Sequence, residues 1–157
     1  MPKTSNKESA CASAGQICVI PTLTIKGADK AIEQYKKAFG AAEEHMLRCP
    51  ETGVVAHCGL KIGESMLFIT EENKERGCIA ATNQTFYLYV PDADEAMKKA
   101  IKAGLKETQK TENMFWGDRM GVVTDPYGIK WSLATHVRDV SPKEMETAMK
   151  KMSGKAA

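Results

Sequence analysis

The chain has 157 residues, of which 43% are hydrophobic and 27% charged, as in an ordinary soluble globular protein. Its net charge of +2 and its scattered lysines give no reason to expect nucleic acid or an anionic membrane as a partner. No apolar run reaches the roughly 20 residues of a membrane-spanning helix, and the polar residues 1–16 lack the core of a secretory signal. We therefore expect a cytoplasmic protein with a flexible N-terminal tail at residues 1–16.

In the first half of the chain, the apolar pattern predicts a strand, a helix and three further strands. The β-branched run ICVIPTLTI at residues 17–25 predicts a strand. Apolar residues then recur at spacings of three and four from Ala28 to Phe39, which predicts an amphipathic helix that Gly40 stops. Three strands are expected after it, the last two joined by a tight hairpin at Gly63-Glu64, over the segments 42–49, 54–62 and 65–72.

The second half repeats this order and adds a helix. We expect a strand at 85–90, a helix at 92–103 and a strand at 105–112, followed by two strands on either side of a DPYG turn, at 117–124 and 129–136. Ser141 and Glu144 match a capping box around Pro142, which predicts a C-terminal helix at about 141–152.

Two pairs of segments share one spacing. The Ala-Asp pair at Ala28 recurs 65 residues later at Ala93, and IGESMLFIT recurs as YGIKWSLAT with Gly63 and Gly128 again 65 apart. Two anchors at a single offset indicate an internal duplication. The predicted fold class is α+β, with tandem βαβββ repeats at about 17–72 and 84–136 and a terminal helix. We expect one domain over 17–152 and a short tail at 153–157.

This tandem pattern, with DPYG before the last strand, resembles the vicinal-oxygen-chelate superfamily of glyoxalases, bleomycin-resistance proteins and dioxygenases. The resemblance covers about residues 17–152 and is nearest to the PhnB-like branch, also labelled 3-demethylubiquinone methyltransferase-like, through YKKAFGAAEE, LKIGESMLFI, FWGDRMGVVTDPYGIKWSLATH and DVSPKEMETAMKKM. It implies that each repeat curls into a half-barrel sheet whose concave side lines a small-molecule pocket. It also implies that protomers pair as a homodimer.

Catalytic members of this superfamily are similar in placing metal ligands at four symmetric positions. Carried onto this chain, those positions are Ile20, Leu67, Thr85 and Ser132, with Phe68 replacing Leu67 if the hairpin shifts by one residue. Family metalloenzymes have His, Gln or Glu there, whereas hydrocarbon and hydroxyl side chains do not hold a divalent ion tightly. We therefore expect no metal and no cofactor, and we assign Thr85 and Ser132 to the lining of a ligand pocket.

Candidate catalytic residues are His57 and Asp118. His57 lies in the middle of a predicted strand and alternates with more apolar neighbours, so it is expected to face the concave side as a pocket base. A core histidine is the alternative. Asp118 and Arg119 fit a pocket acid and an anion clamp, or a pair of charges that fixes a turn.

Phe115 and Trp116 precede Gly117 on a loop before the penultimate strand, where aromatic side chains suit stacking against a planar ligand. The alternative is a lid that packs over the barrel mouth or the dimer seam. Trp131 alternates with Ser132 and is interpreted as a core residue.

The sequence leaves two classes of function open. One is a metal-independent binding protein that sequesters a small planar molecule. The other is an enzyme acting on a small carbonyl or aromatic substrate, by acid–base work of His57 and Asp118 or through an atypical metal site that includes His136. A methyltransferase is disfavoured, because no Gly-rich nucleotide-binding turn follows a predicted strand.

Overall fold

The computed structural model describes residues 19–154 with the exception of residue 82, so the predicted tail at 1–16 and residues 155–157 of the predicted tail at 153–157 lie outside it. The chain forms two compact units. The first contains the described residues up to Ile32 together with Ala41–Ala80, and the second contains Glu33–Gly40 and the residues from Ala81 onward. Each unit is described separately below.

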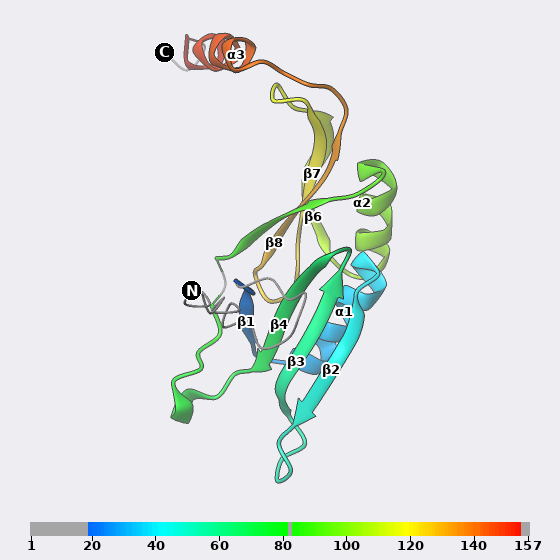
Figure 1. The fold of residues 1–157 in the computed structure, drawn as a ribbon, viewed down its shortest axis with the longest axis vertical. Helices are drawn as coiled ribbons and strands as arrows, with labels where there is room; N and C mark the ends of the chain where they lie inside the picture. Colours follow the sequence, from blue (N-terminus) through cyan, green and yellow to red (C-terminus); the bar gives the residue numbers. More distant parts are fainter. Residues whose placement is uncertain (1–18, 82, 155–157) are drawn as a thin grey trace, which may run out of the picture. The chain divides into compact units, whose positions relative to one another are not determined.

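The first unit is a four-stranded sheet with the start of one helix, whose residues from Glu33 onward belong to the second unit (Figure 1). Its strands have the order β1-β4-β3-β2, with β1 parallel to β4 and the other pairs antiparallel. The elements are β1 (Thr22–Ile25), α1 (Ala28–Phe39), β2 (Ala42–Arg48), β3 (Val55–Ile62), β4 (Ser65–Glu71) and the 3-10 helix η1 (Lys74–Arg76), which the sequence did not predict.

β1 is shorter than the predicted strand at 17–25, of which residues 17 and 18 are not described. Pro21 has no N–H to donate, and it contributes only its carbonyl oxygen, which accepts a bond of 2.9 Å from the Phe68 amide. Regular pairing therefore starts after this residue, with Thr22 opposite Phe68.

One face of the first sheet is apolar and buried. Its side chains are at most 2% exposed at Leu23, Ile25, Cys58, Leu60 and Ile69. The buried start of α1 supplies Ala28, Ala31 and Ile32. The Glu71 carboxylate accepts bonds of 2.8 Å from both the Gly27 and the Ala28 amides, which satisfies unpaired N–H groups at the helix start.

The second unit repeats the topology, with strand order β5-β8-β7-β6 and β5 parallel to β8. Helix α2 contacts β6, β7 and β8 (Figure 1). Its elements are β5 (Thr85–Tyr89), α2 (Ala93–Lys102), β6 (Lys106–Asn113), β7 (Asp118–Thr124), β8 (Lys130–His136) and α3 (Pro142–Gly154). The α+β class, the two βαβββ units and the C-terminal helix are thus confirmed.

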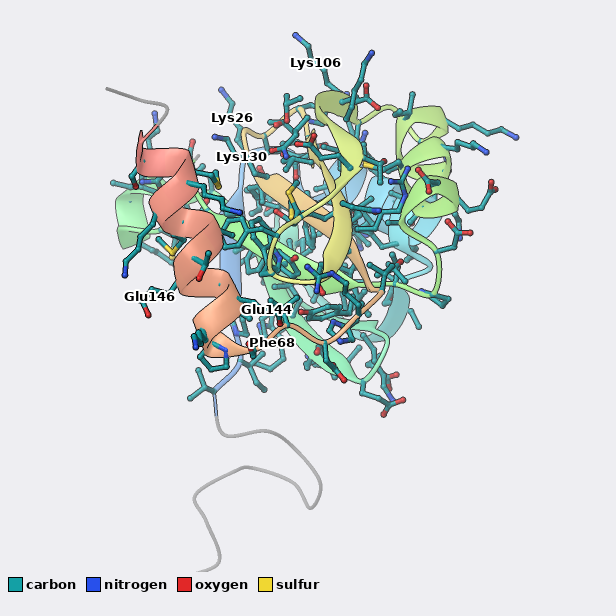
Figure 2. All side chains as sticks on the ribbon, turned by 90° about the horizontal axis from the view of Figure 1, so that it is seen from above. Lys26, Phe68, Lys106, Lys130, Glu144 and Glu146 are labelled. Atoms are coloured by element: carbon teal, nitrogen blue, oxygen red, sulfur yellow. The ribbon has the colours of Figure 1, made fainter. Side chains whose placement is uncertain are left out.

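The capping box of α3 forms as predicted. The Ser141 hydroxyl accepts from the Glu144 amide at 3.2 Å, and the Glu144 carboxylate accepts from the Ser141 amide at 2.9 Å. Figure 2 shows Glu144 and Glu146 in the N-terminal part of this helix. No residue of α3 is buried.

The 65-residue offset holds for the helix starts at Ala28 and Ala93 but is one residue too long for the last strands. In β4, Leu67 and Ile69 belong to the buried face, as Trp131 and Leu133 do in β8. The spacing changes upstream of these hairpins, because Leu60 and Val123, which face Leu67 and Trp131, are 63 residues apart. The structural counterpart of Ser132 is therefore Phe68, the shifted alternative, and not Leu67.

A buried carboxylate organises the core of the second unit. Asp125, only 4% exposed, accepts bonds from the Tyr127 and Ile129 amides, both at 2.9 Å. It also accepts from the Tyr35 hydroxyl at 2.6 Å and from Trp131 Nε1 at 3.2 Å. Burial and the neighbouring carboxylate raise the pKa of Tyr35, so this phenol remains a neutral donor. Trp131 is 3% exposed, which confirms it as a core residue.

We expect Asp125→Ala to lower the free energy of unfolding by about 3–5 kcal/mol, because it leaves several buried donors unpaired. Urea unfolding followed by circular dichroism measures the loss. Glu64→Ala is the matched control, since that carboxylate is 99% exposed and its ion pair with Lys61 is 3.9 Å long. Equal, small losses in both variants would show that the Asp125 contacts do not hold the unit together.

Candidate ligand-binding site

Tyrosines cover the face of the second sheet opposite the buried Trp131. Strand pairing sets Tyr87 beside Ser132, Tyr89 beside Ala134 and Asp118 beside His136. Paired residues project to the same side of a sheet. We call this surface the tyrosine face, and its members are Thr85, Tyr87, Tyr89, Asp118, Met120, Val122, Ser132, Ala134 and His136.

Asp118 is the centre of the tyrosine face and is only 2% exposed. Its Oδ2 accepts hydrogen bonds from the hydroxyls of Tyr87 at 2.7 Å and Tyr89 at 3.0 Å. Its Oδ1 lies 3.0 Å from Nδ1 of His136. Trp116 extends this network, because its Nε1 donates to the Tyr87 hydroxyl oxygen at 3.2 Å.

The network keeps the carboxylate ionised and the phenols neutral. Burial is the strongest single influence on Asp118 and opposes ionisation, but the hydrogen bonds from Tyr87, His136 and Tyr89 together lower its pKa below the usual value. Burial, with the bond to Asp118, raises the pKa of Tyr87 to about 12. The bond to Asp118 also raises the pKa of Tyr89. At neutral pH the site therefore contains a buried negative charge held by neutral donors.

His136 lies at the exposed edge of the site. Its Nε2 is 2.8 Å from a carboxylate oxygen of Asp139, and bonds to Asp139 and then Asp118 raise the pKa of the imidazole. The backbone after it is held by Gly117, whose carbonyl accepts from the Val137 and Arg138 amides. Gly117 has a φ of +101°, and a Cβ there would collide with the Arg138 carbonyl oxygen, so only glycine allows this close approach.

The predicted site residues of the second unit separate into two groups. Trp116 joins the tyrosine face, and the half-buried Phe115 packs edge to face against it at 5.0 Å. Ser132 lies beside Tyr87 at 6% exposure, and Thr85 lies at the exposed start of β5. Arg119 does not join them, because it projects to the other face.

Arg119 binds the start of α2. Its guanidinium donates to both carboxylate oxygens of Asp94, at 2.7 and 2.9 Å, and to Asn113 at 3.2 Å. This bidentate geometry fastens β7 to α2. This contact differs from the turn-fixing pair with Asp118 that was the alternative to an anion clamp.

His57, the other predicted catalytic residue, belongs to the first unit. It stacks on His45 at 4.9 Å and meets the Phe68 ring edge-on at 4.5 Å, on the face opposite the buried Cys58. We call this cluster, with Gly59, the histidine face. A Cβ at Gly59 would collide with the His45 ring, so the glycine makes room for it. Burial, and then the nearby His45, lower the pKa of His57.

The predicted pairing of His57 with Asp118 combines residues of different units, and the partners described for each come from its own unit. The pairing therefore stays a prediction.

Sequence reasoning missed Tyr87, Tyr89 and His45. The first two were detectable, because in the segment TFYLY they alternate with apolar Phe86 and Leu88 and so share a face with Thr85, which was assigned to the pocket. His45 follows two glutamates, a pattern typical of a solvated position. Its ring contacts depend on the pairing of β2 with β3, which local sequence does not reveal.

The residues at the family's metal positions do not fit a divalent cation. Thr85 and Ser132 offer hydroxyls only, Phe68 replaces Leu67, and Ile20 is a hydrocarbon. Across residues 19–81 and 83–154, no group of three or more His, Cys, Asp or Glu side chains is arranged to bind a metal ion. In the same described part of the chain, no helix is long and apolar enough to cross a membrane.

The chain consists of two βαβββ units in tandem, and the second sheet carries a polar cluster. Comparison with known proteins identifies the family that has this fold. The profile of the Glyoxalase/Bleomycin resistance protein/Dioxygenase superfamily matches residues 18–133. The chain belongs to this superfamily, the vicinal-oxygen-chelate group that its sequence resembles.

Its relatives include proteins without an assigned activity. An uncharacterized protein of Mycobacterium bovis is 33% identical over 137 residues, which cover 82% of this chain and 90% of that protein. The X-ray structure of an Arabidopsis thaliana gene product matches with a TM-score of 0.62 and 28% identity, covering 76% of this chain and 98% of that one. The PhnB protein of Bacillus cereus matches in fold, with a TM-score of 0.60, 15% identity and coverage of 76% and 99%.

We expect the pKa of His136 to lie above the usual value of 6.5 and the pKa of His57 to lie below it. Proton NMR of the imidazole resonances measures both. Because the folded pKa of His136 is raised, its bonds stabilise the protein fully below about pH 6.5, and this contribution disappears as pH rises through the folded pKa. Asp139→Asn should lower the pKa of His136 and leave that of His57 unchanged; no change in either would refute the bond to Asp139.

Proposed function

We propose that this protein binds a small planar molecule on the tyrosine face without using a metal ion. The observation that carries the proposal is the set of aromatic side chains around the buried carboxylate of Asp118. Tyr87 is 44% exposed and Tyr89 63% exposed, so large aromatic surfaces remain in contact with water. A stacked ligand would remove that surface from water and gain the attraction between aromatic rings.

The rings are positioned before a ligand arrives. Both tyrosine hydroxyls bind Asp118, and Trp116 binds the Tyr87 oxygen, which restricts the torsions of all three side chains. Tyr87 and Tyr89 are 5.3 Å apart between ring centroids. Prior ordering of this kind lowers the entropy that binding would otherwise cost. Sequestration without turnover is also in keeping with a superfamily whose name includes bleomycin resistance proteins.

Acid–base catalysis on a small carbonyl or aromatic substrate is the second candidate. The contact that favours it is the 3.0 Å pair of Asp118 and His136, because a carboxylate bound to an exposed imidazole can deliver or accept a proton. Binding and catalysis are separated by chromatography of the ligand after incubation with the protein, since a binding protein returns it unchanged.

We further propose that residues 17–152 form one domain and that two copies make a homodimer. The outer strands β1, β2, β5 and β6 each pair on one side only within their units. Strand edges of this kind favour association unless they are covered. The thiols of Cys49 and Cys78, which form no disulfide, support the cytoplasmic location that the sequence predicts.

Trp116→Ala should weaken the binding of a planar probe by roughly 2- to 12-fold, the loss of about 0.5–1.5 kcal/mol of ring stacking. Quinoline is a suitable probe, with affinity measured by NMR titration. Ile79→Ala is the control, because Ile79 is 63% exposed and lies in the first unit. Unchanged affinity combined with a large drop in melting temperature would show that Trp116 serves packing instead of binding.

Sedimentation equilibrium should give the mass of a dimer at tens of micromolar, roughly the range in which a standard interface associates. The monomer has a mass of 17.2 kDa. A single species of that mass over this concentration range would refute the homodimer.

A further inference from the structure

The tyrosine face contains a negative charge that is incompletely balanced. Asp118 is ionised at neutral pH, and two of its partners, Tyr87 and Tyr89, are neutral donors. The cationic partner that the structure gives it is His136, which is charged only while its imidazole is protonated. Asp139 lies on the other side of that imidazole and adds a second negative charge. Lys130, the other cationic side chain of the sheet's last strand, is six residues away at the opposite end of β8.

Three electron-rich rings surround this charge. The faces of tyrosine and tryptophan rings carry negative electrostatic potential and attract cations. Tyr87 and Tyr89 are inclined at 59° to each other, and Trp116 is fixed to Tyr87 by the bond from its Nε1. Each phenol also donates its proton toward a carboxylate, which increases the electron density of the ring. The rings and the carboxylate therefore both favour a positively charged ligand.

We infer that the planar ligand of this site is a cation, either a positively charged aromatic nitrogen heterocycle or a ring bearing a methylated ammonium group. This inference rests on the proposed binding function and adds the charge of the ligand to it. The cation lies against the faces of Tyr87, Tyr89 and Trp116, while Asp118 remains bonded to the two hydroxyls beneath. Long-range attraction to a shielded carboxylate and contact with ring faces act together, so no direct salt bridge is needed.

His136 sets the pH dependence of this preference. The titratable and charged groups around the imidazole are Asp118, Asp139, Tyr87 and Tyr89, of which the phenols stay neutral over the working range. When His136 is protonated, its charge offsets that of Asp118 and competes with the ligand. Cation binding is therefore stronger above the pKa of His136, which its two carboxylate neighbours raise.

Two probes of the same ring size separate charge from planarity. N-methylquinolinium is a permanent cation, and quinoline is neutral at pH 7 and above. NMR titration of the whole protein at pH 9 should show the cation binding at least 10-fold more tightly than quinoline, with a smaller ratio at pH 7. Equal affinities would overturn the charge inference and leave the proposed planar-ligand function intact. Absence of binding by either probe would overturn both.

Substitutions then test which side chains cause the tighter binding of the cation, measured as the ratio of the two affinities. Asp118→Asn retains an oxygen to accept from both tyrosines and removes the charge, so it should bring the ratio close to one. Tyr89→Leu, at a position 63% exposed, removes one ring and its hydrogen bond to Asp118, leaves the bonds from Tyr87 and His136 to that carboxylate, and should reduce the ratio several-fold. Phe39→Leu is the control, because Phe39 packs against Trp131 on the face of the sheet opposite the tyrosine face. This substitution should leave the affinity ratio unchanged. A ratio that persists in both Asp118→Asn and Tyr89→Leu would overturn the inference.

Discussion

The bond between Asp125 and Tyr35 is the contact on which the second unit depends. It joins the end of α1 to the turn before β8, and the same carboxylate holds the Trp131 indole nitrogen. Because strand side chains alternate, fixing Trp131 in the core directs Ser132 to the opposite face. The register that follows brings His136 opposite Asp118 at the far end of the hairpin. The candidate site is therefore positioned by a buried interaction that no ligand contacts.

Two nearly buried aspartates illustrate how similar burial serves different purposes. Asp125 has two backbone amides among its four donors, and its side-chain donors Tyr35 and Trp131 are themselves buried. Asp118 is bound by side chains alone, from Tyr87, Tyr89 and His136, all of which are exposed. The second aspartate is thus separated from solvent only by its exposed partners. The first is screened by the protein core.

Periodicity in the sequence predicted the helices and strands well, because it reports directly which positions are apolar. It was less informative where a strand's limits or facing depend on tertiary contacts. Pro21 shortened β1, and a change of spacing between the helix and the hairpin of each unit made Phe68, and not Leu67, the counterpart of Ser132. Arg119 illustrates the same limit, since only the pairing of β7 with its neighbours and α2 shows that it binds Asp94 and points away from the site.

The duplicated framework has acquired different chemistry on its two sheets. At corresponding places the first unit carries Phe68 beside two stacked imidazoles, and the second carries Ser132 beside tyrosines bonded to a carboxylate. The lowered pKa of His57 favours its neutral form near pH 7, so this imidazole presents an aromatic surface without charge. The tyrosine face presents aromatic surface over an ionised group. The two units have therefore kept the same strand order, while the non-core faces of their sheets carry different side chains.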